Sequence, residues 1–129
     1  MKPLLFALLF ALAACLKDET ISGYADPAAI YRLTELNGRP FTARATIGFA
    51  EPGTVAGEAA CNRYSANQAA PYPWISIGPI AATKRACPDL AQEAAFFAAL
   101  ASATLAEVAG DTLILSDEVG GQMVFRVQD

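Results

Sequence analysis

The segment Cys87–Thr104, "CPDLAQEAAFFAALASAT", differs in periodicity from the rest of the chain. Apolar residues at positions 90, 94, 97 and either 100 or 101 are spaced by three or four residues, which is the repeat of one helix face. Pro88 and Asp89 precede them, where a helix start tolerates proline and favours an acid. The pattern therefore predicts one main helix over residues 89–102.

Short segments with strand character flank this helix on both sides. Strands are expected at 30–36, 43–50, 54–59, 74–77 and 80–84 before the helix, and at 104–109, 112–116 and 123–127 after it. Asn37-Gly38 predicts a hairpin turn because both residues accept positive φ, and residues 62–73 suggest an irregular loop. Short turns require antiparallel pairing. We therefore predict an α+β fold, a curled antiparallel sheet (a partly open barrel) packed with one main helix.

The N-terminus has the features of a secretory signal. Lys2 precedes the apolar run "LLFALLFAL" (residues 4–12), which is shorter than the roughly 20 residues that a membrane-spanning helix needs. "LAAC" at 12–15 resembles the lipobox of bacterial lipoproteins, which implies that Cys15 is lipidated and becomes the new N-terminus. The alternative is ordinary signal cleavage with an incidental Cys15. We expect a signal peptide at 1–14, a lipidated N-terminus and flexible tether at 15–29, and a domain at 30–129.

This resemblance also implies where the protein lies in the cell. A lipid on Cys15 would hold it on a membrane, because each buried methylene contributes about 0.8 kcal/mol. The residue after Cys15 is not Asp. By resemblance to Gram-negative lipoproteins, this favours the outer membrane of the bacterial envelope, facing the periplasm.

Composition excludes several classes of function. Without Lys2 the chain keeps eight basic and thirteen acidic residues, so we expect no nucleic-acid binding and a monomer. The absence of histidine removes the common catalytic triads and the commonest metal ligand, and we expect no catalytic site, metal or cofactor.

Cys61 and Cys87 should form a disulfide in an oxidising compartment, rather than a redox or metal-binding dithiol.

Several motifs together resemble the META domain, the small domain of the heat-shock lipoprotein HslJ and its relatives. They are the Asn37-Gly38 turn, "GEAACNRY" (57–64), "ATKRACP" (82–88) and the late segment "GDTLILSD…GGQMVFR". The resemblance covers residues 30–128 and implies an envelope location and an α+β or mixed α/β fold. It implies no defined biochemical activity.

The same motifs supply the candidate binding loop. Its residues are Asn62, Arg63, Tyr64, Lys84 and Arg85. A structural role for Asn62 and Tyr64, in capping backbone groups and filling the core, is the favoured interpretation. Glu51 and Glu58 are interpreted as solvated acids rather than a catalytic pair.

The functional hypothesis is a non-enzymatic envelope lipoprotein that binds or supports another envelope component, with a link to stress. One alternative is a carrier of a small apolar ligand, with a cavity lined by Leu113 and aromatic side chains at 74, 96, 97 and 125. Core packing of these side chains is the favoured interpretation. The other alternative is an inhibitor of an envelope enzyme that acts through the loop at 62–73.

Overall fold

A computed structural model describes residues 17–129, so the signal peptide and Cys15 lie outside the described residues. The described part contains one short 3-10 helix, nine strands and one α-helix. Their bounds are η1 Ile21–Gly23, β1 Ile30–Leu36, β2 Arg39–Pro40, β3 Thr46–Gly48, β4 Thr54–Glu58, β5 Arg63–Asn67, β6 Ala81–Ala82, α1 Leu90–Ser102, β7 Leu105–Ala109, β8 Thr112–Ser116 and β9 Gln122–Val127.

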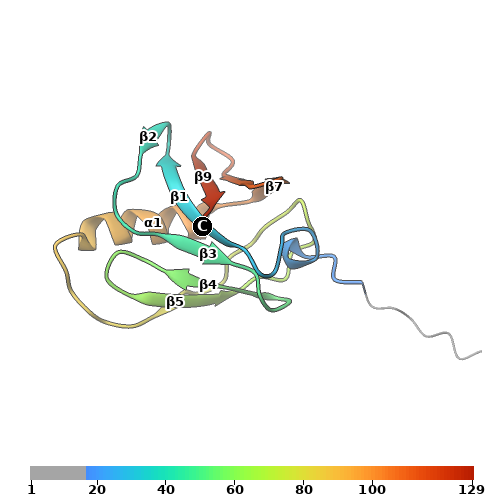
Figure 1. The fold of residues 1–129 in the computed structure, drawn as a ribbon, viewed down its shortest axis with the longest axis horizontal. Coiled ribbons are helices and arrows are strands. Elements are labelled where there is room, and N and C mark those ends of the chain that lie inside the picture. The colour runs from blue at the N-terminus through green and yellow to red at the C-terminus, as the bar shows by residue number, and fades with distance from the viewer. Residues whose placement is uncertain (1–16) are drawn as a thin grey trace, which may run out of the picture.

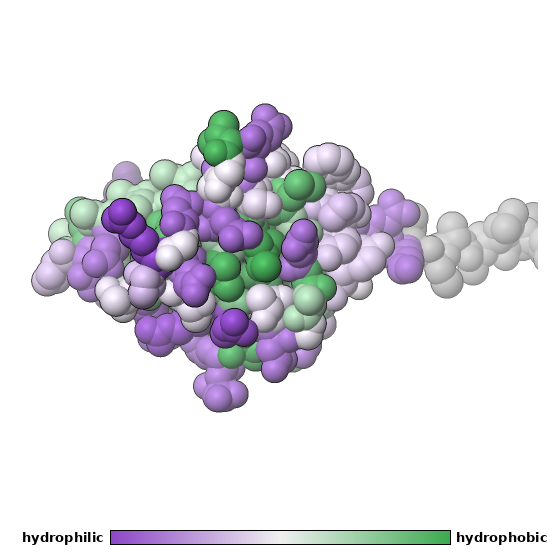
Figure 2. Space-filling model, turned by 90° about the horizontal axis from the view of Figure 1, so that it is seen from above, coloured by the Kyte–Doolittle hydropathy of each residue, from purple (hydrophilic) through white to green (hydrophobic). Residues whose placement is uncertain are grey.

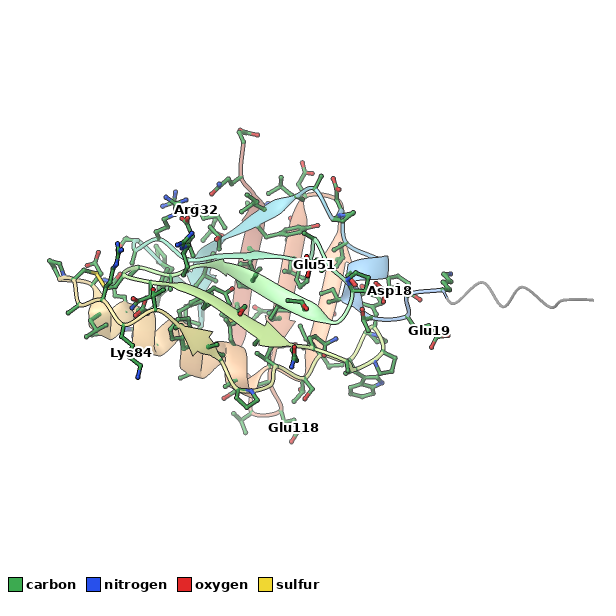
Figure 3. The ribbon with its side chains drawn as sticks, turned by 90° about the horizontal axis from the view of Figure 1, so that it is seen from below. Asp18, Glu19, Arg32, Glu51, Lys84 and Glu118 are labelled. Carbon is green, nitrogen blue, oxygen red and sulfur yellow. A yellow bond between two sulfur atoms is a disulfide. The ribbon has the colours of Figure 1, made fainter. Side chains whose placement is uncertain are left out.

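All nine strands form one antiparallel sheet that is not closed into a barrel. Its order is β6-β5-β4-β3-β1-β9-β8-β7, with β2 paired to β1 as a hairpin. The sheet curls, so that the strands of the β3–β5 half cross over those of the β7–β9 half, as Figure 3 shows with the colours of Figure 1. Helix α1 packs on this sheet, which confirms the predicted α+β class.

The sequence periodicity predicts the main elements closely. The expected helix at 89–102 is α1, and the three strands expected after it are β7, β8 and β9. The predicted face of the helix is wrong, because α1 buries Glu93, Phe96 and Leu100 while positions 90, 94 and 101 are exposed. The adjacent Phe96 and Phe97 and the many alanines make two faces of this helix similarly apolar in sequence.

Tyr31 and Leu33 are buried on one face of β1, whereas Glu35 is exposed because the β1–β9 register shifts between Leu33 and Glu35. Asn37 has a φ of 52°, which confirms the turn predicted there.

Two predictions before the helix are wrong, one of a loop and one of a strand. Residues 63–67, expected to belong to an irregular loop, form β5 and pair along the whole of β4. Residues 74–77, expected to form a strand, contribute only isolated bridges, from Trp74 to Leu105 and from Ile77 to Gln68. In β5, with the sequence RYSAN, burial alternates from residue to residue as in a strand with one buried face. Its small polar residues are typical of loops, so the sequence did not indicate a strand.

Aromatic and aliphatic side chains fill the core between the two halves of the sheet. Phe96, Leu113 and Phe125 are completely buried, and the Phe96 and Phe125 rings lie 6.4 Å apart between centroids. Trp74, by contrast, is 56% exposed. These side chains therefore pack as a core and do not enclose the apolar cavity that a carrier would use.

Residues 18–29, expected to belong to a flexible tether, lie against the domain. Ile21 is only 2% exposed and belongs to the core cluster. The Tyr72 backbone N–H donates to the Glu19 carbonyl at 2.8 Å, and the Tyr24 and Tyr72 rings stack at 4.4 Å. The packed unit therefore begins well before the expected boundary at residue 30.

The surface is largely polar on the face seen from above, with a limited apolar area near its centre (Figure 2). Within residues 17–129, no helix has the length and hydropathy required to cross a membrane.

Candidate functional site

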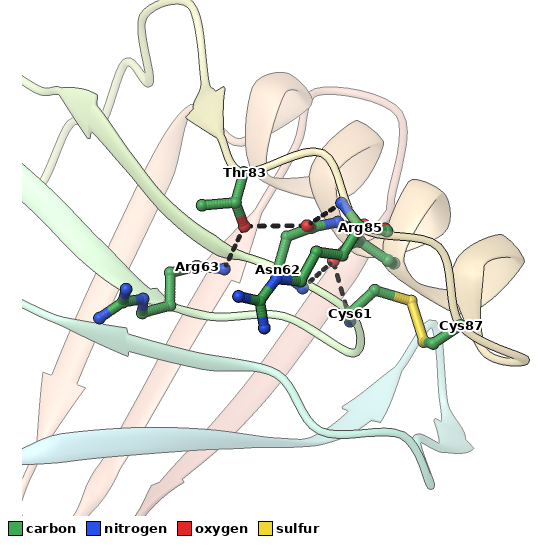
Figure 4. The surroundings of a disulfide bond; sticks show 7 residues. Cys61, Asn62, Arg63, Thr83, Arg85 and Cys87 are labelled. Atoms are coloured by element: carbon green, nitrogen blue, oxygen red, sulfur yellow. Dashed lines mark hydrogen bonds between the residues drawn. A yellow bond between two sulfur atoms is a disulfide. The ribbon is translucent and has the colours of Figure 1, made fainter.

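A disulfide joins Cys61 to Cys87 and brings two distant segments together (Figure 4). The two Cα atoms lie 5.5 Å apart, although 26 positions separate the residues in sequence. Cys61 lies in the turn between β4 and β5, and Cys87 lies just before α1. The bond therefore fixes the β4–β5 turn against the start of the helix.

A buried carboxylate holds the same turn from the helix side. Glu93, in the first turn of α1, is 4% exposed. Its Oε1 accepts the backbone N–H groups of Cys61 (3.1 Å) and Asn62 (2.9 Å). Its Oε2 accepts the Asn62 Nδ2 group at 2.7 Å. Three donors thus compensate the burial of this acid, and its place near the helix N-terminus adds favourable electrostatics.

The Asn62 side chain connects this carboxylate to the segment before the helix. Its Nδ2 also donates to the Arg85 carbonyl at 3.0 Å. Its Oδ1 accepts the Arg85 backbone N–H at 2.7 Å and the Thr83 hydroxyl at 2.9 Å (Figure 4). Asn62 is 7% exposed and fully bonded, so its role is to set the backbone path of residues 83–85.

Tyr64, on β5, joins the sheet to the helix. Its ring contacts the rings of Phe96 and Phe97 at centroid distances of 5.6 and 5.4 Å. Its hydroxyl donates to the Thr46 carbonyl at 2.6 Å. The neighbouring strand approaches so closely at Gly57 that a Cβ there would lie 2.2 Å from the Thr46 carbonyl oxygen. Burial raises the pKa of the Tyr64 hydroxyl well above its ordinary value.

This raised pKa predicts a loss of stability in alkali. In the folded state the Tyr64 hydroxyl stays protonated, whereas in the unfolded chain it ionises above about pH 10. Its contribution to the free energy of unfolding is therefore full below about pH 10 and falls by about 1.4 kcal/mol for each pH unit above it. Tyr64→Phe should cost about 1 kcal/mol at neutral pH through the lost hydrogen bond, and should remove this contribution to the alkaline decline. Urea unfolding at pH 7 to 11 measures both effects. Tyr24→Phe, at an exposed ring, is the control, and an equal alkaline slope for Tyr64→Phe and wild type contradicts the assignment.

Basic side chains gather around a groove above this buried network. We define the basic groove by its lining, which encloses about 440 Å³ and consists of Arg44, Glu58, Ala59, Ala60, Cys61, Asn62, Arg63, Thr83 and Arg85. Arg44 Nη2 and Glu58 Oε2 form a salt bridge at 2.5 Å, which is the one salt bridge within residues 17–129. Exposed Arg63 and Arg85, and the adjacent Lys84, therefore have no acidic partner within salt-bridge distance in the described structure. The groove offers guanidinium groups to an anionic ligand.

The structure divides the predicted binding loop into two sets. Asn62 and Tyr64 are buried and structural, whereas Arg63, Lys84 and Arg85 are exposed at or beside the basic groove. Sequence reasoning missed Arg44, which antiparallel pairing of β3 with β4 brings to the groove. It also missed the role of Glu93, for which an acid in the first helical turn next to a disulfide was the available signal.

The fold is that of a small α+β domain with a single main helix. A disulfide and a buried carboxylate hold the β4–β5 turn of this domain against the start of the helix. A model of the META domain family matches residues 28–129. The chain therefore belongs to the META domain family.

Solved structures are similar in fold at low sequence identity. An NMR structure of a protein from Burkholderia xenovorans has 19% identity and a TM-score of 0.65, covering 83% of this chain and 86% of that one. A crystal structure of a DUF4847 family protein from Bacteroides vulgatus has 14% identity and a TM-score of 0.64, covering 80% of this chain and 96% of that one. No curated protein matches the sequence significantly.

Proposed function

We propose that this chain is a membrane-anchored, non-enzymatic lipoprotein of the bacterial envelope whose META domain binds an acidic segment of another envelope protein. The observation that carries the proposal is the basic groove. Arg63 and Arg85 line it without a salt-bridge partner in the described structure, in a chain that is acidic overall.

The charge pattern supports an acidic partner rather than a general attraction. Because the protein is negative overall, it repels large acidic surfaces. An acidic segment narrow enough to enter the basic groove is attracted there by the local positive charge. Planar guanidinium groups bind carboxylates in pairs of parallel hydrogen bonds. The rigid backbone beneath the groove, set by the disulfide and Asn62, reduces the ordering cost of binding.

The anchor in this proposal is lipid on Cys15. The support is the "LAAC" sequence after a short apolar run, together with a core cluster whose first member is Ile21, six residues after Cys15. The association with stress remains an expectation from the family resemblance.

Crosslinking in intact cells tests the partner. A photoreactive residue in place of Lys84 should capture an envelope protein with the wild-type groove, and Arg63→Glu combined with Arg85→Glu should abolish the captured band. The matched control is Arg39→Glu with Arg126→Glu, two exposed basic residues outside the groove, and it should leave the band unchanged. A captured band that both double variants retain would contradict the groove as the binding site.

Fractionation tests the anchor, because Cys15→Ser should remove the protein from the membrane fraction.

A further inference from the structure

An exposed aromatic patch lies away from the basic groove. We define the aromatic patch as Tyr24, Tyr72, Trp74 and Leu105. Tyr24 stacks on Tyr72 at 4.4 Å, and Trp74 forms a β-bridge with Leu105. The exposed fractions are 48% for Tyr24, 56% for Trp74 and 37% for Leu105. Large apolar side chains that share one surface region indicate contact with something other than water.

The N-terminal chain starts from this patch. The Tyr72 backbone N–H donates to the Glu19 carbonyl at 2.8 Å, so the backbone at residue 19 lies directly beside it. Cys15 is four residues earlier in the sequence, and four extended residues span at most about 14 Å. A lipid on Cys15 would therefore bring the bilayer surface to within reach of the patch.

The chemistry of the patch fits the boundary of a bilayer. Tryptophan and tyrosine concentrate at membrane interfaces, because their rings are apolar and their polar atoms bond with headgroups and water. Asp18 and Glu19 lie at this end of the molecule and Lys84 at the opposite end (Figure 3). Residues 17–29 carry one base, Lys17, against three acids, Asp18, Glu19 and Asp26, so the local charge does not attract anionic headgroups and the rings make the contact.

We propose that the aromatic patch rests in the headgroup region of the membrane that holds the lipid anchor, and so directs the basic groove away from the bilayer. The inference depends on the proposed lipidation of Cys15. It adds a second membrane contact, which fixes the orientation that a single tether leaves free.

Trp74 makes the inference directly measurable because it is the one tryptophan in the chain. The purified mature lipoprotein is reconstituted into phosphatidylcholine vesicles with or without bromine on the upper acyl chains. We expect Trp74 emission to lie at shorter wavelength in vesicles than for an indole in water, because an interfacial indole leaves water. We expect its intensity to fall by about half when brominated lipid replaces plain lipid, because an interfacial indole contacts the upper acyl chains.

The control moves the reporter to the other end of the domain. Trp74→Phe with Leu90→Trp places an indole at a position that is 45% exposed at the start of α1, near Cys87. Its emission should be unchanged by bromine. Equal quenching of the two reporters, or quenching of neither, overturns the inference. Intact-mass analysis separates the two proposals: an unmodified Cys15 overturns the anchor and the inference together, whereas a lipidated protein with an unquenched Trp74 overturns the inference alone.

Discussion

Removal of the disulfide is expected to lower the free energy of unfolding by about 3.5 kcal/mol. Cys61 and Cys87 are 26 positions apart, and the crosslink restricts that loop in the unfolded chain. Both residues are partly exposed, so replacement by alanine leaves little buried cavity to add to the loss. The measurement is urea unfolding of Cys61→Ala with Cys87→Ala against the oxidised wild type.

The single variants provide the control for this prediction. Cys61→Ala alone and Cys87→Ala alone each break the same crosslink, so each should cost nearly as much as the double variant, and their effects should not add. Reduced wild type should match them. A loss for the double variant of less than about 1 kcal/mol would mean that the crosslink contributes little to stability.

Replacement of Glu93 by alanine should destabilise the fold by about 3 kcal/mol or more. The variant leaves three donors, from the Cys61 and Asn62 backbones and from Asn62 Nδ2, without their acceptor in a buried site. Each unsatisfied buried donor costs about 1–3 kcal/mol. Thermal and urea unfolding measure the loss, and amide hydrogen exchange at residues 61 and 62 should increase.

Glu93→Gln refines this prediction by keeping the shape and changing the chemistry. Its oxygen still accepts the two backbone N–H groups, but its NH₂ group faces Asn62 Nδ2, so two donors oppose each other. We expect an intermediate loss of about 1–2 kcal/mol. Glu107→Ala, at an exposed acid on β7, should change stability by less than about 0.5 kcal/mol. A Glu93→Ala loss equal to that of Glu107→Ala would contradict the buried network.

Local patterns predicted the elements because each element depends on neighbours in sequence. The position of helix α1 follows from the change in periodicity, although its buried face, at Glu93, Phe96 and Leu100, was not the predicted one. The β1–β2 turn follows from Asn37-Gly38.

Strand β5 was missed because only Tyr64 and Ala66 face the core, and the polar residues between and beside them are typical of a loop. Trp74 was expected in the core by its apolar character, but its exposure is decided by long-range packing.

The site could be predicted only in part, because it depends on which segments meet. The bond between Cys61 and Cys87 was predicted because the chain was expected to be exported and Cys15 was assigned to lipid, which left these two cysteines to pair. Glu93 reads in sequence as an ordinary acid in a first helical turn, and only the position of the β4–β5 turn gives it three donors. Arg44 reaches the basic groove through strand pairing that no local pattern encodes.

The most direct test of the proposed binding role is an NMR titration of the oxidised protein with a hexaglutamate peptide. The predicted result is saturable shifts of the Arg63, Thr83 and Arg85 amides that weaken with added salt, because charged groups in the groove carry the affinity. Arg63→Glu with Arg85→Glu should abolish these shifts, and Arg39→Glu with Arg126→Glu should retain them. Absence of saturable shifts in the wild type, or equal affinity in the two double variants, would contradict the account.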